Sequence, residues 1–69
     1  MKYEGIITKD VSTEEEQFVE VQLKDKSTVT CKPSRKMVDA GIILAVGDNV
    51  IFLANGGFRT GTIIYRART

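Results

Sequence analysis

Two runs of alternating apolar and polar residues, separated by a short polar turn, constrain this chain more than any other feature. In the first run Val19, Val21 and Leu23 fall on one face, and polar residues fill the positions between them. The segment 28–32 alternates in the same way, and residues 25–27 form a polar turn between the runs. A period of two is typical of a half-buried strand. The sequence therefore predicts an antiparallel hairpin.

Three further segments predict strands, and one predicts a helical turn. The strands are expected at 3–10, 49–54 and 61–68, with Gly5 at a bend or close backbone approach in the first of them. Pro33-Ser34 ends the hairpin's second strand, and Ser34 caps a short helical turn over 35–40 that Gly41 stops. Five strands with one short helical turn between strands 3 and 4 predict an all-β, five-stranded OB barrel. An SH3-like barrel is the nearest competitor.

The length and the residue types present narrow the functional classes. A chain of 69 residues allows one domain, here 1–69, and buries about 60% of its unfolded surface. One cysteine and no histidine exclude an intrachain disulfide and leave no ligand cluster for a metal, so no cofactor is expected. Apolar runs stay far below the roughly 20 residues of a membrane span. We expect a cytoplasmic monomer that is not an enzyme, since it also has no nucleophile–base pair.

Charge is divided unevenly along the chain. Residues 1–31 carry a formal net charge of −3 and residues 32–69 carry +4, which together give +1. All four arginines lie in the second part, and arginine's planar fork suits phosphates and base edges. This asymmetry predicts one basic face that binds nucleic acid, and the alternative is an ordinary solvated surface. The candidate RNA-binding residues are Lys32, Arg35, Lys36, Phe58, Arg59, Arg66 and Arg68.

The positions of the aromatic residues in the sequence predict different environments for them. Tyr65 and Phe52 are predicted to lie in the core, on the apolar faces of their strands. Phe18 alternates with polar residues and is interpreted as covering the barrel bottom or pairing with Ile6 across the sheet, in preference to stacking a base. Phe58, beside a glycine pair, is either a contact at a loop tip or a lid on one end of the barrel.

Several short motifs, in their order and spacing, resemble bacterial translation initiation factor one, an S1-like OB domain of about this size. They span nearly the whole chain and comprise Glu4-Gly5, Val19 to Leu23, Val29-Thr30, Lys36-Met37, Gly47-Asp48-Asn49-Val50, Gly61, Ile63, Tyr65, Arg66 and Arg68. The resemblance implies binding to the small ribosomal subunit through 16S ribosomal RNA and a neighbouring ribosomal protein. It also implies action beside the other initiation factors, without any chemistry of its own.

The chain departs from that family where RNA would be touched. Arg35 and Val38 stand where the family usually has Gly and Arg, and Gly41 and Ile43 stand where it has Tyr and Arg. In addition, Thr62 replaces a basic residue, and the acidic run Glu14–Glu16 replaces a Pro-Asn turn.

These replacements support an alternative, a small β-barrel adaptor or inhibitor that binds a protein partner. The alternative gains if Val38 and Ile43 are exposed beside the basic residues, and the RNA interpretation gains if they are buried.

Overall fold

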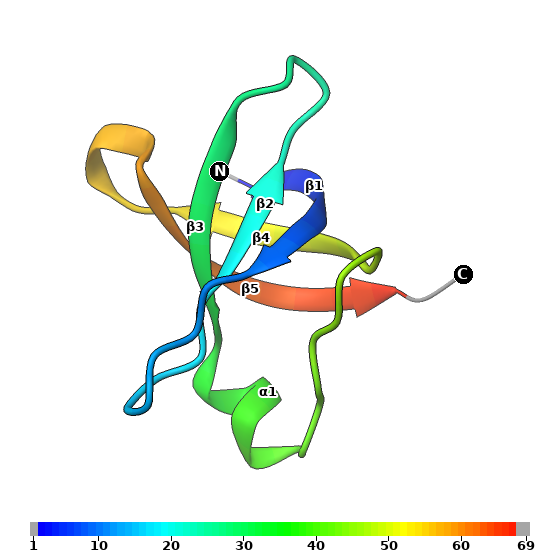
Figure 1. Cartoon of the computed structure of the whole chain (residues 1–69), viewed down its shortest axis with the longest axis vertical. Helices are drawn as coiled ribbons and strands as arrows, with labels where there is room; N and C mark the ends of the chain where they lie inside the picture. Colours follow the sequence, from blue (N-terminus) through cyan, green and yellow to red (C-terminus); the bar gives the residue numbers. More distant parts are fainter. Residues whose placement is uncertain (1, 68–69) are drawn as a thin grey trace.

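A computed structural model describes residues 2–67 and shows five strands wound into a closed barrel (Figure 1). The strands are β1 (Lys2–Asp10), β2 (Val19–Gln22), β3 (Thr28–Pro33), β4 (Asn49–Ala54) and β5 (Thr60–Ala67). They follow the order β1-β2-β3-β5-β4, and β4 pairs back onto β1. β3 and β5 are parallel, whereas the other pairs are antiparallel. The predicted five-stranded OB barrel is confirmed.

The predicted hairpin forms with its apolar face inward. Val19 pairs with Cys31 and Val21 pairs with Val29, and all four side chains are buried. β1 crosses this hairpin at Gly5, where an added Cβ would collide with the Val21 side chain and lie 2.8 Å from the Gln22 carbonyl oxygen. Only glycine lets the two backbones approach this closely, which confirms the expected close approach.

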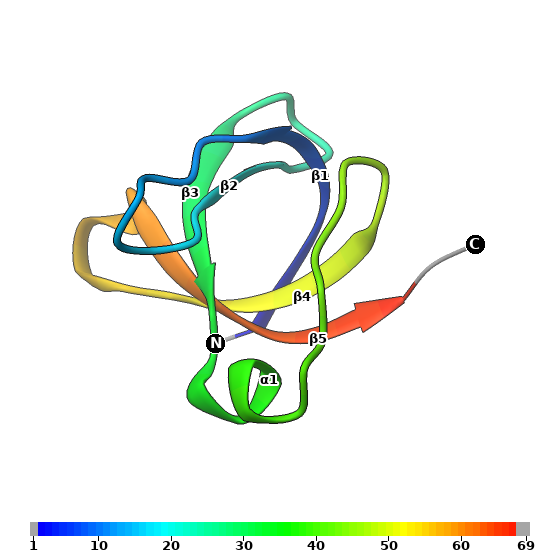
Figure 2. The ribbon, with the colours of Figure 1, turned by 60° about the horizontal axis from the view of Figure 1, so that its bottom comes forward.

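The helical segment between β3 and β4 is α1 (Arg35–Asp39), as predicted. The Ser34 hydroxyl accepts a hydrogen bond from the Met37 amide at 3.3 Å, and Gly41 follows the helix with a φ of +72°. Met37 is buried in the core, and α1 lies beside the ring of strands (Figure 2). The strand ends at Pro33-Ser34, as predicted, with the buried Pro33 as its last residue.

The structure adds a second short helical segment that was not predicted. This 3-10 turn, η1 (Gly56–Phe58), joins β4 to β5. Gly57 and Phe58 both have positive φ within it. The glycine pair therefore lies within this turn.

One apolar core fills the barrel. Its buried members are Ile7, Val19, Val21, Val29, Cys31, Met37, Leu44, Val50, Phe52 and Ile63, which confirms the prediction for Phe52.

The core prediction for Tyr65 was wrong, because its side chain is 57% exposed. Phe52 pairs with Ile63, but the preceding Ile51 pairs with Tyr65, so Ile64 is an extra residue in β5. A bulge of this kind reverses the alternation beyond it. Tyr65 consequently faces outward.

Candidate nucleic-acid interface

The structure brings two of the predicted basic residues together where β3 passes into α1. Lys32 is exposed near the end of β3, and Arg35 is the first residue of α1. The Arg35 guanidinium lies 3.7 Å from a carboxylate oxygen of Asp39, one turn later, with both side chains largely exposed. Such an exposed pair contributes little to stability and is easily exchanged for another anion. Lys32 and Arg35 therefore remain available to bind a phosphate.

The surface that joins these cations to the β4–β5 turn is a strip of threonines. β3 and β5 pair in parallel, with Thr30 against Thr60 and Lys32 against Thr62. These side chains point outward, since the residues that alternate with them are buried. Arg59 immediately precedes Thr60, and its carbonyl oxygen accepts a hydrogen bond from the Thr30 amide at 3.3 Å. We call this outer surface, from Arg59 along the threonines to Lys32 and Arg35, the β3–β5 strip.

The chemistry of the β3–β5 strip suits a nucleic-acid backbone. At about 3.3 Å per residue, Arg59 and Lys32 stand roughly 10 Å apart along the strands. Hydroxyl groups between two cations can bond to phosphate and sugar oxygens, which sets position without reading sequence. The parallel pairing that assembles the strip joins segments 30 residues apart in the chain. The charge pattern identified its cations but not its threonines.

A groove at the Lys32 end of this strip is lined by carboxylates as well as by cations. Glu15 and Glu16 line it together with Lys32, Arg35 and Val38. The loop that carries the glutamates is held by side-chain bonds, in which the Thr13 hydroxyl accepts from the amides of Glu15 at 3.3 Å and Glu16 at 3.1 Å.

At the base of the same loop the Ser12 hydroxyl donates to Asp10 at 2.6 Å and accepts from the Phe18 amide at 3.1 Å. The Ser12 hydroxyl and amide also lower the pKa of Asp10. The acidic loop is thus fixed beside the cations, and the groove is electrostatically mixed.

Phe58 packs against another aromatic ring and is also partly exposed to solvent. Its ring meets the Tyr3 ring edge-on, with centroids 4.6 Å apart, and Tyr3 in turn lies 5.8 Å from the buried Phe52 ring. These contacts favour the interpretation of Phe58 as a lid, although 38% of the residue stays exposed. Phe18 is half-buried, in accord with its interpretation as a cover.

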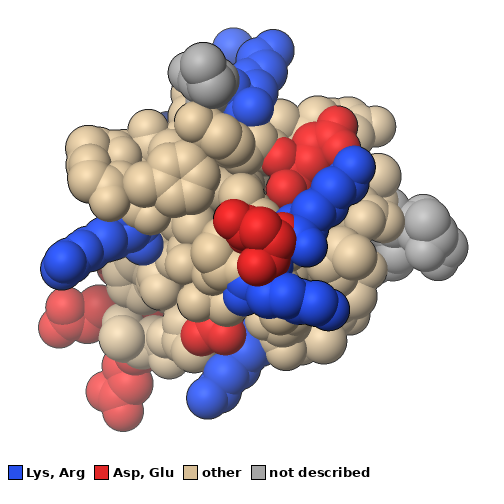
Figure 3. All heavy atoms as spheres, turned by 90° about the horizontal axis from the view of Figure 1, so that it is seen from above, with Lys and Arg blue, Asp and Glu red and all other residues tan. Residues whose placement is uncertain are grey.

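The remaining predicted residues do not join the strip. Lys36 is exposed on α1 and is not part of the groove that Arg35 lines. Arg66 is half-buried in β5 and pairs with Val50, while Arg68 lies outside the described residues. In the view from above the β2–β3 turn, basic and acidic side chains lie next to one another without a continuous basic surface (Figure 3). The predicted basic residues are not all brought together, since Arg66 lies beside Val50 in the sheet and the groove of Lys32 and Arg35 does not include Lys36.

Val38 and Ile43 are 56% and 72% exposed, and Val38 lies beside Lys32 and Arg35. Exposed apolar side chains beside cations are the arrangement expected of a surface that binds a protein partner.

Within residues 2–67 no group of three or more acidic, cysteine or histidine residues is arranged to hold a metal ion. The described helices include none with the length and apolar character needed to cross a bilayer. The Cys31 thiol is buried, and desolvation raises its pKa to about 12, which keeps it protonated and unreactive. The arrangement suits binding through cations, hydroxyls and apolar side chains.

Comparison with solved structures identifies proteins of similar fold. Translation initiation factor one from the Wolbachia endosymbiont strain TRS of Brugia malayi superimposes with a TM-score of 0.73 at 22% identity, over 99% of this chain and 78% of that one. The crystal structure of YjeQ from Thermotoga maritima gives a TM-score of 0.71 at 19% identity, over 99% of this chain and 23% of that chain. No protein-family model matches the chain, and no curated protein matches it in sequence. At these identities the likeness establishes the fold, and function has to be argued from the site.

Proposed function

We propose that this chain is a non-catalytic RNA-binding OB domain that acts on the small ribosomal subunit during initiation. The observation that carries the proposal is the β3–β5 strip, with Arg59 at one end and Lys32 and Arg35 at the other, on a barrel that matches an initiation factor over most of both chains. In this proposal the chain is a cytoplasmic monomer that contacts 16S ribosomal RNA and a ribosomal protein beside the other initiation factors. The rigid barrel favours one conformation of the subunit by binding it more tightly than the others.

The test is binding of labelled protein to purified small subunits across a salt series, with an unrelated single-stranded RNA as control. We expect saturation at one protein per subunit and a clear preference over the control RNA. The Lys32→Ala/Arg35→Ala double variant should bind more weakly, with the slope of log affinity against log salt reduced by about 2.

Lys2→Ala/Lys9→Ala is the matched control for that double variant. It removes the same charge from β1, which pairs with neither β3 nor β5, and it should bind nearly as well as the unchanged chain. Equal weakening by both double variants would mean that only total charge matters. Absence of preferential subunit binding would reject the proposed function.

A second candidate function, docking on a protein partner, is favoured by the exposure of Val38 beside Lys32 and Arg35. Val38→Arg separates the two. On an RNA-binding surface the added cation should tighten subunit binding several-fold and steepen its salt dependence by about one ion. On an apolar protein interface the same change buries a charge and weakens binding. Weaker subunit binding by Val38→Arg would therefore favour protein docking.

A further inference from the structure

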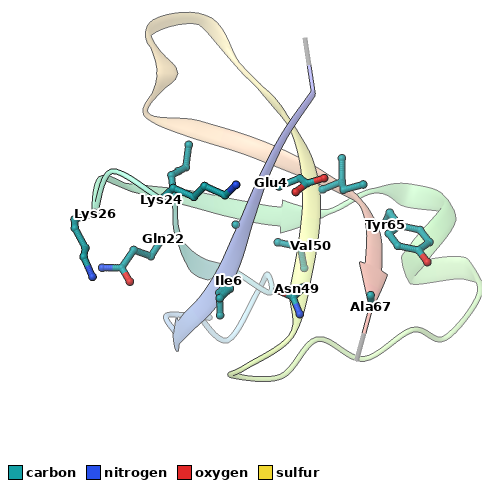
Figure 4. Close-up of a pocket in the computed structure, with 12 residues that line it drawn as sticks. Glu4, Ile6, Gln22, Lys24, Lys26, Asn49, Val50, Tyr65 and Ala67 are labelled. Carbon is teal, nitrogen blue, oxygen red and sulfur yellow. The ribbon is translucent and has the colours of Figure 1, made fainter. Parts of the chain in front are cut away.

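A second concave surface lies on the side of the barrel away from the β3–β5 strip. It is a groove of about 460 Å³ over the outer faces of β1, β2, β4 and β5 (Figure 4). Its lining includes no residue of β3 or α1. The residues that the following argument uses are Glu4, Ile6, Gln22, Lys24, Lys26 and Tyr65.

The floor of this groove is apolar and set by the register of the strands. Glu4 pairs with Ile51, and Ile51 pairs with Tyr65, so these three residues form a row across β1, β4 and β5. In the adjacent row Gln22 pairs with Ile6, and Ile6 pairs with Asn49. Ile6 is 48% exposed, and the Tyr65 ring faces outward because of the bulge at Ile64. The row pattern thus places an accessible aromatic ring beside the half-buried Ile51, with the exposed Ile6 in the adjacent row.

Two lysines stand at the end of the groove opposite Tyr65 (Figure 4). They come from the β2–β3 turn, where Lys26 has a φ of +75°. Asp25, between them, accepts hydrogen bonds from the Ser27 hydroxyl at 2.5 Å and the Ser27 amide at 3.0 Å and does not line the groove. Across residues 2–67 the ion pair found is Arg35–Asp39, so Lys24 and Lys26 are not paired with Glu4. Among the described residues, neither lysine forms an ion pair, so both positive charges in the groove remain available to a ligand.

We propose that this groove binds a short segment of single-stranded RNA, with one base stacked on Tyr65 and the backbone phosphates at Lys24 and Lys26. Three strand spacings separate the two ends, about 14 Å, which is room for a few nucleotides. Glu4, between the ends, accepts a hydrogen bond from an exocyclic amine, the contact by which carboxylates recognise cytosine. The amides of Gln22 and Asn49 bind sugar hydroxyls or base edges.

An RNA segment suits this surface better than an extended peptide does. A peptide that adds to a sheet takes its affinity from main-chain bonds to a free strand edge. β4 pairs on both sides, and β1 pairs with β4 over Lys2–Ile6 and with β2 from Ile6 onward, so the free strand edge beside the groove is limited to Lys2–Gly5 and the groove offers mainly side chains. An exposed aromatic ring, cations and amides are the groups that bind single-stranded RNA from a protein surface.

The test is a titration of the full chain with a cytidine RNA hexamer, followed by fluorescence anisotropy and by amide chemical shifts. Tyr65→Leu keeps an apolar side chain but removes the ring, and we expect it to weaken hexamer binding by roughly 5- to 100-fold. Tyr65→Phe keeps the ring and should bind within about twofold of the unchanged chain. Tyr65 is exposed, so neither change should alter the melting temperature, which serves as the check on folding.

Variants of the charged residues provide further tests of the proposed RNA site. Lys24→Ala/Lys26→Ala should weaken hexamer binding and flatten its salt dependence, whereas Lys2→Ala/Lys9→Ala should not. Glu4→Gln should reduce the preference for cytidine over uridine hexamers. The DNA hexamer of the same bases should bind more weakly, because it lacks the 2′-hydroxyl.

Several outcomes would overturn this assignment. They are equal hexamer binding by Tyr65→Leu and Tyr65→Phe, absence of hexamer binding, and shifts confined to the β3–β5 strip. The assignment and the proposed function fail independently. Hexamer binding at Tyr65 without subunit binding would reject the initiation function alone. Subunit binding that responds to Lys32 and Arg35, together with no hexamer binding that depends on Tyr65, would reject the second RNA site alone.

Discussion

Gly61 packs closely against the core, and an added methyl group there has a predictable cost in stability. An added Cβ would lie 2.7 Å from the Phe52 ring and 3.1 Å from both the Cys31 sulfur and the Leu53 carbonyl oxygen. Because β5 is paired on both sides at this point, we expect Gly61→Ala to lower the free energy of unfolding by about 1–3 kcal/mol. Urea denaturation measures it. Gly56→Ala is the control, since its Cβ would meet open space and the change restricts the unfolded chain, so it should leave stability unchanged or slightly raised. A similar loss there would contradict the steric explanation.

Cys31 makes stability depend on pH in the alkaline range. Burial raises its pKa from the ordinary 9.0 to about 12, so above pH 9 the unfolded chain ionises this thiol and the folded chain does not. The folded state therefore loses stability as the pH rises from 9 towards 12, by at most about 1.4 kcal/mol per pH unit. Urea denaturation at pH 8 and pH 10 should show this loss, and Cys31→Val should remove it. An equal loss in the valine variant would assign the effect to other groups.

At the scale of a secondary-structure element, α1 is too short to persist by its own propensity and depends on its cap and on Met37. Ser34→Ala removes the hydroxyl that accepts from the Met37 amide, and we expect it to cost about 0.5–2 kcal/mol of unfolding free energy. Ser34→Thr keeps an acceptor and should recover most of the loss. Thermal or urea unfolding distinguishes the two variants. If threonine is as damaging as alanine, the cap contributes nothing measurable.

The strands show where sequence patterns suffice and where they do not. Val19, Val21 and Val29 alternate strictly, and both their burial and their pairing followed from that period. Ile63-Ile64-Tyr65 is apolar at every position, so nothing in the sequence marks the extra residue of a bulge. That one residue exposes Tyr65 and creates the apolar floor of the second groove. The groove's lysines were missed for another reason, since they belong to the acidic part of the chain and reach the β1, β4 and β5 face only through the β2–β3 turn.

At the scale of the whole molecule, charges distant in sequence meet in one groove and oppose each other. Glu15 lines the groove with Lys32 and Arg35, whereas Glu14, in the same loop, does not. If the β3–β5 strip binds RNA, Glu15→Gln removes a repulsion from the phosphates, and subunit binding should tighten by a few-fold at low salt. Glu14→Gln removes the same charge and should change binding less. Identical effects of the two changes in the salt series would show that net charge alone is responsible.

The candidate site could be predicted only in part at this scale. The charge pattern pointed to Lys32, Arg35 and Arg59, which the structure places in β3, in α1 and just before β5. Their convergence depends on which strands are neighbours, and the parallel pairing of β3 with β5 is not encoded in any local pattern. Arg35 and Arg66 both belong to the arginine-rich part of the chain. Arg35 is nevertheless exposed on α1, whereas Arg66 is half-buried in β5 and pairs with Val50.

The strand that closes the barrel also sets how the chain folds. β5 pairs with β3 on one side and β4 on the other, so a chain without it would leave two sheet edges open and the core exposed. Contacts between segments far apart in sequence are slow to form, and here they must all form together. Folding is therefore expected to be a single cooperative event. The buried amides of β1 and β3 should exchange with solvent only when the entire ring opens.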